Sequence, residues 1–159
     1  MPTRLSPEIC YIAGLAGKTK QGERSMVGIN TTIDEMIENF VEVAMKLGVE
    51  PKKIIIEDTR GIRHAYFFHS KIAKQIRDIL AKETKVFRHK NEFAAMFLAG
   101  MFDANGKIRN GSISIGGMSP ADRLVIENLG MRTKDSKILD AKKFAEFVGE
   151  RSVILGGMF

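Results

Sequence analysis

The chain has 159 residues, of which 44% are hydrophobic and 28% are charged, and this composition is typical of a globular protein with a sizeable core. No apolar run approaches the roughly 18–20 residues of a membrane span, and the N-terminus lacks the long apolar segment of a signal peptide. Because Cys10 is the only cysteine, an internal disulfide is excluded, and we expect a cytoplasmic protein without a membrane partner.

The charges are unevenly distributed along the chain. The net charge is +6, but Asp34, Glu35, Glu38 and Glu42 cluster on one predicted helix, and segments 9–22 and 104–121 contain no acid. Two locally basic segments on a basic protein indicate a polyanionic partner, most simply nucleic acid. Ordinary solubilising surface charge is the alternative.

The first half, residues 1–86, begins with a predicted helix and hairpin. Ser6 and Pro7 are typical of a helix start, and the helix is expected to end near Ala16. A hairpin follows over residues 17–31. With a three-residue loop at 21–23, one face of this hairpin carries polar residues and glycine, while Val27 and Ile29 point the other way. That first face comprises Lys18, Lys20, Arg24, Gly28 and Asn30.

The rest of this half continues as helix, hairpin and helix. Thr32 and Glu35 form a capping-box pattern before an amphipathic helix that runs to Gly48. Residues 53–69 predict a hairpin turning near Arg60-Gly61, and residues 70–82 predict a helix. Arg60 and Arg63 lie near the hairpin tip, where they could contact a DNA backbone or simply belong to a charged loop.

The second half, residues 87–159, contains the clearest hairpin. An apolar helix is predicted over 92–102, and the small residues 103–106 are expected to form a turn that stops it. Asn110-Gly111 is the strongest two-residue hairpin signal, since a type I′ turn needs positive φ at both positions. Pairing across this turn places four polar residues on one face and isoleucines on the other. The polar four are Lys107, Arg109, Ser112 and Ser114.

The end of the chain predicts less structure. Ser119-Pro120 starts a helix that ends before Gly130, residues 131–139 supply one strand, and Asp140 caps a last helix. The second half is therefore expected to lack a complete second hairpin.

Residues 98–106, LAGMFDANG, resemble the nine-residue signature of the LAGLIDADG homing endonucleases. Six of the nine positions are identical, and Met101 and Phe102 are apolar replacements. A weaker copy, IAGLAGKTK, lies 86 residues upstream at 12–20. One strong and one eroded copy, each at the start of a half, resemble the degenerate form of a single-chain, pseudo-twofold member of that family.

The resemblance implies an α+β, homing-endonuclease-like fold and a monomer. Two αββαββα-type halves, each with a concave antiparallel sheet, would be related by a pseudo-twofold axis between the motif helices. Small residues in these helices suit close packing, because a mid-helix glycine otherwise costs about 1 kcal/mol relative to alanine. The expected interface residues are Ala13, Gly14, Gly17, Ala95, Ala99 and Gly100.

The resemblance also implies which acids should bind metal, and they are missing. The family's metal-binding acid is the eighth motif residue, and these positions are Thr19 and Asn105. Mg²⁺ prefers carboxylate oxygens, so we expect no catalytic residue and no metal or other cofactor. Asp103, at the sixth position, is expected to be structural and to bond backbone N–H groups near Gly106.

We therefore predict a protein that binds duplex DNA through Lys18, Lys20, Arg24, Asn30, Arg60, Arg63, Lys107, Arg109, Ser112 and Ser114 but does not cut it efficiently. Three alternatives are an active Mg²⁺-dependent endonuclease using Asn105 and an unforeseen acid, a maturase-like protein that binds structured RNA, and a protein-interaction domain.

Overall fold

The computed structural model describes residues 4–17 and 25–156. The first half contains the elements α1 (Pro7–Ala16), β1 (Met26–Thr31), α2 (Asp34–Lys46), η1 (Pro51–Lys53), β2 (Ile55–Thr59), β3 (Ile62–Phe68), α3 (Ser70–Ala81) and α4 (Glu83–Val86). The second contains α5 (Glu92–Asn105), β4 (Gly106–Arg109), β5 (Ser112–Ile115), α6 (Pro120–Asn128), β6 (Thr133–Lys134), β7 (Lys137–Ile138), α7 (Ala141–Val148), η2 (Gly149–Arg151) and α8 (Val153–Gly156). No helix among the described residues is long and apolar enough to cross a membrane.

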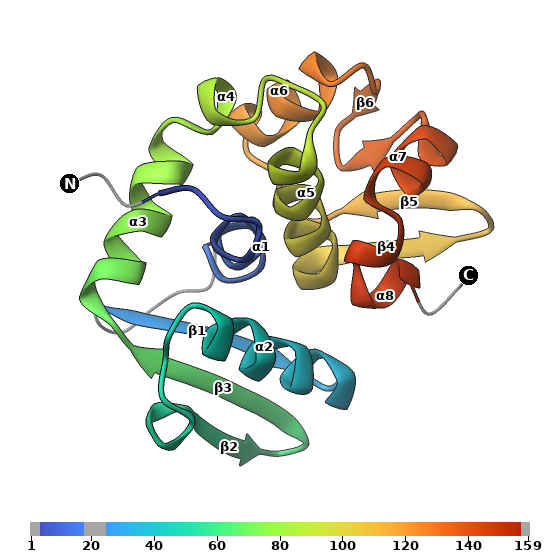
Figure 1. Ribbon diagram of the computed structural model, residues 1–159. Helices are drawn as coiled ribbons and strands as arrows, with labels where there is room; N and C mark the ends of the chain where they lie inside the picture. The colour runs from blue at the N-terminus through green and yellow to red at the C-terminus, as the bar shows by residue number, and fades with distance from the viewer. Residues whose placement is uncertain (1–3, 18–24, 157–159) are drawn as a thin grey trace.

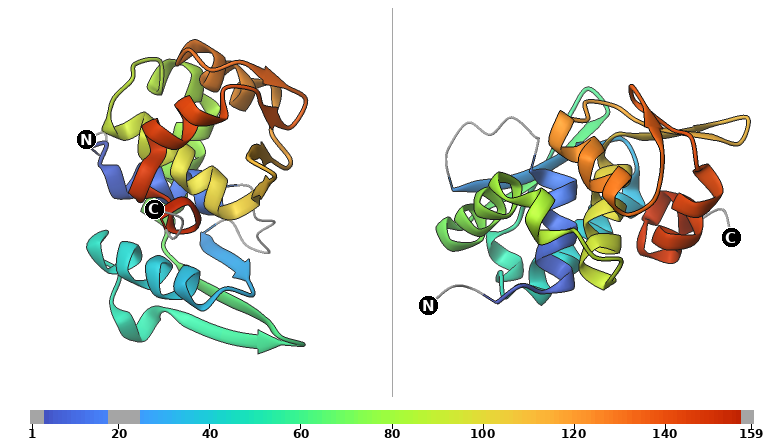
Figure 2. Two further views of the ribbon diagram at one scale, coloured as in Figure 1. Left: turned by 90° about the vertical axis from the view of Figure 1, so that its right-hand side faces the viewer. Right: turned by 90° about the horizontal axis from the view of Figure 1, so that it is seen from above.

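The two motif helices, α1 and α5, pack side by side at the centre of the molecule (Figures 1 and 2). A Cβ atom on Gly14 would lie 2.2 Å from the Phe97 carbonyl oxygen, and one on Gly100 would lie 2.1 Å from that of Tyr11. Tyr11 and Gly14 each correspond to their partner 86 residues later, so the contact is reciprocal. The backbones touch along a pseudo-twofold axis, as the sequence predicts.

The other predicted interface residues mostly agree with this packing. Ala13, Ala95 and Ala99 are at most 1% exposed. Gly17 differs, because a Cβ there would meet the Leu80 side chain of α3 at 2.5 Å as well as its own helix. Gly17 therefore allows α3 to approach and does not contribute to the α1–α5 contact in the predicted way.

The first sheet has the strand order β1-β3-β2, with antiparallel pairing throughout. Val27 and Ile29 of β1 pair with Phe67 and Ala65 of β3, and all four are buried beneath α1, α2 and α3. The opposite face of the sheet carries no helix (Figure 1). The predicted turn at Arg60-Gly61 is present, and the first arm of the predicted 17–31 hairpin lies outside the described residues.

The second sheet has the order β4-β5-β7-β6 and is more complete than the sequence predicts. Residues 131–139 supply two short antiparallel strands, β6 and β7, and not the single strand expected. They turn at Asp135, whose φ is +54°. Ile113, Ile115 and Ile138 face the core, so the apolar side of the predicted β4–β5 hairpin is confirmed.

Three local expectations need correction. Helix α5 continues through Asp103, Ala104 and Asn105 and ends only at Gly106, so these residues do not form the predicted turn. The predicted cap at Thr32 is absent, because α2 begins at Asp34 without a side-chain cap. Asp140 precedes α7, but its carboxylate binds Arg132 and leaves the α7 N-terminus uncapped.

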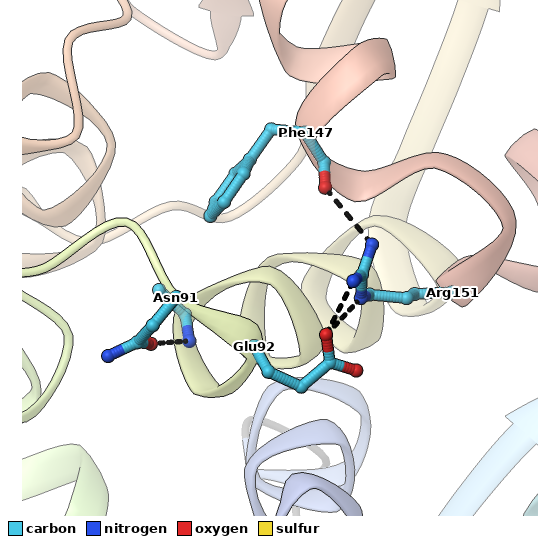
Figure 3. A network of polar contacts seen from close by, with 5 residues as sticks. Asn91, Glu92, Phe147 and Arg151 are labelled. Carbon is cyan, nitrogen blue, oxygen red and sulfur yellow. Dashed lines mark hydrogen bonds and ion pairs between the residues drawn. The ribbon is translucent and has the colours of Figure 1, made fainter.

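The N-terminus of α5 is fixed to the end of the chain (Figure 3). Asn91 caps the helix by accepting a hydrogen bond from the Ala94 backbone N–H at 3.0 Å. Arg151 of η2 bonds the Glu92 carboxylate through Nε at 2.8 Å and through Nη2, and it also donates to the Phe147 carbonyl. These contacts hold α7 and η2 against α5.

Cys10 offers a probe of this central packing. The thiol is fully buried in α1, and burial raises its pKa to about 12. The thiolate is the reactive form, so at pH 8 its population is on the order of one in ten thousand. We expect alkylation of the native protein at pH 8 to follow global unfolding, with a rate that rises sharply across the urea transition. Rapid alkylation without urea would contradict the packing of α1.

Candidate nucleic-acid interface

A row of cations crosses the outer face of the second sheet. The observed pairing of Lys107 with Ser114 and of Arg109 with Ser112 is the predicted register. Ser114 then pairs with Lys137, and Lys137 pairs with Lys134. Because directly paired residues of an antiparallel sheet share a face, four cations and two hydroxyls project from one surface.

This surface, here called the basic face, consists of Lys107, Arg109, Ser112, Ser114, Lys134 and Lys137. It contains no acid within strands β4 to β7; Asp135 lies in the turn between β6 and β7. Lys107, Arg109 and Lys134 are exposed. The basic face therefore suits phosphate groups, which lysine and arginine bind as charge-assisted partners.

Sequence reasoning missed Lys134 and Lys137. Strands of two residues are too short to show an alternating pattern, so no periodic signal marks them. The available signal was the Asp135-Ser136 pair, a combination that favours turns, between two lysines.

The first-half candidates are placed differently. Asn30 lies on the outer face of the first sheet, where its Oδ1 is 2.5 Å from Nδ1 of His64. Arg60 is exposed at the β2–β3 tip. Arg63 projects from the helix-covered face and pairs with Asp34 at 2.6 Å, so the structure does not bring it together with the others. Lys18, Lys20 and Arg24 lie outside the described residues.

The two outer faces lie on a common side of the molecule. The right panel of Figure 2 shows the tips of the β2–β3 and β4–β5 hairpins projecting toward the same side of the α1–α5 pair. Helices occupy the other face of each sheet. A single elongated ligand can therefore contact both sheets.

Asp103, the only acid of the strong motif, is held in a buried network. Its Oδ2 accepts from the Tyr11 hydroxyl at 2.5 Å and from the Val153 N–H at 2.9 Å. Its Oδ1 accepts from the Ser152 hydroxyl at 2.6 Å and from the Ile154 N–H at 3.1 Å. Burial raises the pKa of Asp103, while these four donors act in the opposite direction by stabilising the carboxylate.

The structural role expected for Asp103 is therefore present, but its partners differ from those predicted. Its backbone donors belong to α8, about fifty residues away in sequence, and not to the Gly106 region. Tyr11, on the other motif helix, also accepts a hydrogen bond from Asn39 of α2 at 2.7 Å. The network joins both motif helices, α2 and α8.

The ends of the motif helices do not suit a divalent metal. Asn105 is exposed and offers only a neutral side-chain carbonyl, and Thr19 lies outside the described residues. Both oxygens of Asp103 are occupied by hydrogen-bond donors. Within 4–17 and 25–156, no group of three or more acids, histidines or cysteines could hold a metal ion. The residues present therefore do not form a site for the ions that carboxylate pairs hold.

A groove of about 750 Å³ lies between α2 and β2, on the helix-covered side. Its lining combines apolar residues such as Met45 and Ile56 with the acids Asp34, Glu38 and Glu42. The acidic rim makes this groove unsuitable for a phosphate backbone, which leaves the outer sheet faces as the candidate interface.

The solved structures most similar in shape are of one protein. I-DmoI in complex with DNA and Mn superposes with a TM-score of 0.67, covering 89% of this chain and 96% of that chain at 19% identity. A variant of I-DmoI with its target DNA gives a TM-score of 0.68, covering 89% and 93% at 19% identity. The fold is that of the homing endonuclease I-DmoI. The α+β architecture with two antiparallel sheets is thus confirmed.

Sequence comparison adds a weaker match. The chain is 28% identical over 138 residues to an A-type ATP synthase protein, the B component of that enzyme in Methanopyrus kandleri strain AV19. The match covers 80% of this chain and only 13% of that protein. No family model matches the chain. At these identities, the homing-endonuclease likeness establishes the fold, and the activity has to be argued from the residues.

Proposed function

We propose that this protein binds duplex DNA with the outer faces of its two sheets and does not cleave it efficiently. The two halves, residues 1–86 and 87–159, each supply one sheet, so a monomer contacts two adjacent half-sites. A cytoplasmic setting is consistent with its single, buried cysteine.

The basic face carries the proposal. Four cations lie on one surface formed by β4 to β7, and the strand residues of that surface include no acid. Duplex DNA presents two phosphates per base pair and favours such surfaces. The I-DmoI structures with target DNA support a duplex as the ligand for this fold.

The absence of efficient cleavage follows from the donor atoms at the motif ends. Metal-assisted hydrolysis of a phosphodiester needs ions held by carboxylates near the scissile phosphate. Asn105 brings no negative charge, and the Asp103 carboxylate is saturated by four donors within the protein. We expect a supercoiled plasmid to stay intact with Mg²⁺ at high protein concentration.

Removing two cations of the basic face should weaken binding measurably. In the Lys107→Ala/Arg109→Ala variant, we expect the slope of log K against log salt to become less negative by about 1–2, since each phosphate contact contributes about −0.9. Affinity at low salt should fall about tenfold or more. Fluorescence anisotropy with a labelled plasmid fragment measures both quantities.

A matched control is available on α7. The Lys142→Ala/Lys143→Ala variant removes the same net charge from exposed positions on a helix and not on the basic face. It should leave the slope nearly unchanged, whereas Lys134→Ala/Lys137→Ala should resemble the first variant. Equal effects of all three variants would mean that binding reflects net charge alone, and wild-type binding by all three would overturn the proposal.

A further inference from the structure

The outer face of the first sheet is apolar where that of the second is basic. Phe68, Ile62 and Ile55 are 45%, 44% and 38% exposed. Ile55 pairs directly with Tyr66, and Phe68 and Ile62 follow the same alternation along β3, so these side chains share one face. The rings of Phe68 and Tyr66 meet edge to face at 5.8 Å. We call these four residues the apolar face.

Polar groups beside the apolar face are already paired with each other. The Tyr66 hydroxyl donates to Glu57 at 2.9 Å, and Asn30 meets His64 at 2.5 Å. Glu57 repels phosphate oxygens, because like charges in contact are unfavourable. The described part of this face therefore favours an apolar group on its ligand over a phosphate.

The two sheets lie on the same side of the α1–α5 pair, so a duplex held by the basic face continues across the apolar face (Figure 2). In the major groove of a duplex, the apolar group available to a protein is the C5-methyl group of thymine, or of 5-methylcytosine. The major groove is wide enough to admit a two-stranded β-ribbon such as β2–β3.

We propose that the apolar face recognises pyrimidine C5-methyl groups, so that the half-site bound by the first sheet is rich in thymine. This inference rests on the proposed duplex binding and specifies what one half of the protein recognises. The second sheet holds phosphates by charge, and the first sheet selects bases by apolar contact.

The test compares duplexes that differ only in the methyl group. Wild-type protein is titrated against alternating d(AT) and alternating d(AU) duplexes of equal length. Burying one methyl group changes an equilibrium constant about fourfold, so we expect d(AT) to bind at least about fourfold tighter. Alternating d(GC) with and without 5-methylcytosine should show the same preference.

The Ile55→Ala/Phe68→Ala variant should bind both duplexes with the affinity that the wild type has for d(AU). Because both side chains are substantially exposed, its thermal midpoint should stay close to that of the wild type. The control is Met45→Ala/Leu124→Ala, which truncates two exposed apolar residues on α2 and α6, each 47% exposed, and should retain the methyl preference.

The outcomes separate this inference from the proposed function. Equal binding of d(AT) and d(AU) by the wild type, or a preference that survives in Ile55→Ala/Phe68→Ala, would overturn the methyl contact while leaving duplex binding intact. No binding to any duplex at low salt would overturn the proposed function and this inference with it.

Discussion

The Gly100→Ala variant is expected to be less stable than the wild type by about 3 kcal/mol or more, even though alanine is the better helix former. The new Cβ would lie 2.1 Å from the Tyr11 carbonyl oxygen and 2.7 Å from the Leu15 nitrogen. Both contacts are backbone atoms of α1, so no side-chain rotation can relieve them. The gain in helix propensity is about 1 kcal/mol, and overpacking that forces backbone shifts exceeds it. Urea unfolding followed by circular dichroism measures the difference.

Gly116→Ala is the matched control for this prediction. A Cβ on Gly116 would have as its nearest neighbour the Asn105 carbonyl oxygen at 3.7 Å, an ordinary van der Waals distance. Its stability should change by no more than about 0.5 kcal/mol. Gly14→Ala should match Gly100→Ala, and the double variant should cost less than the sum, because helices already pushed apart accept the second methyl more easily. Additive costs would mean that the two glycines act independently.

The parts of the fold with strong local signals were predictable from the sequence. Asn110-Gly111 set the register of β4 and β5, because its positive φ angles allow only a tight hairpin. The repeated small residues identified α1 and α5 as a packed pair, and the structure confirms the reciprocal contact at Gly14 and Gly100. In each case the information lies within a few adjacent residues.

The missed features depend on contacts between distant segments. Arg63 lies near Arg60 in sequence, yet strand alternation turns it toward Asp34, 29 residues away. Lys134 and Lys137 join the basic face only because β7 pairs with β5. Asp103 could continue α5, and not form a turn, because its acceptors are satisfied by Ser152, Val153 and Ile154. No local pattern encodes these pairings.

Replacing Asp103 by alanine is expected to reduce the free energy of unfolding by about 3–5 kcal/mol. The change would leave four donors facing a cavity: the hydroxyls of Tyr11 and Ser152 and the N–H groups of Val153 and Ile154. Each unsatisfied buried donor costs about 1–3 kcal/mol, and partial relaxation or entry of water offsets part of the sum. Asp103→Asn should cost less but still about 2 kcal/mol, because one amide oxygen replaces two acceptors. Denaturant unfolding measures both variants.

Asp78→Ala provides the reference for loss of an acid from the surface. Asp78 pairs with Lys74 one helical turn away, and the two side chains are 63% and 72% exposed, so its removal should cost under about 0.5 kcal/mol. The comparison also decides between two roles for Asp103. A structural carboxylate predicts a large loss of stability in Asp103→Ala and no plasmid cleavage in the wild type. A metal-binding carboxylate predicts wild-type stability together with loss of a Mg²⁺-dependent nicking activity. The second pattern would contradict the hydrogen-bond network, since a carboxylate that accepts four internal donors has no lone pair left in a favourable geometry for a metal ion.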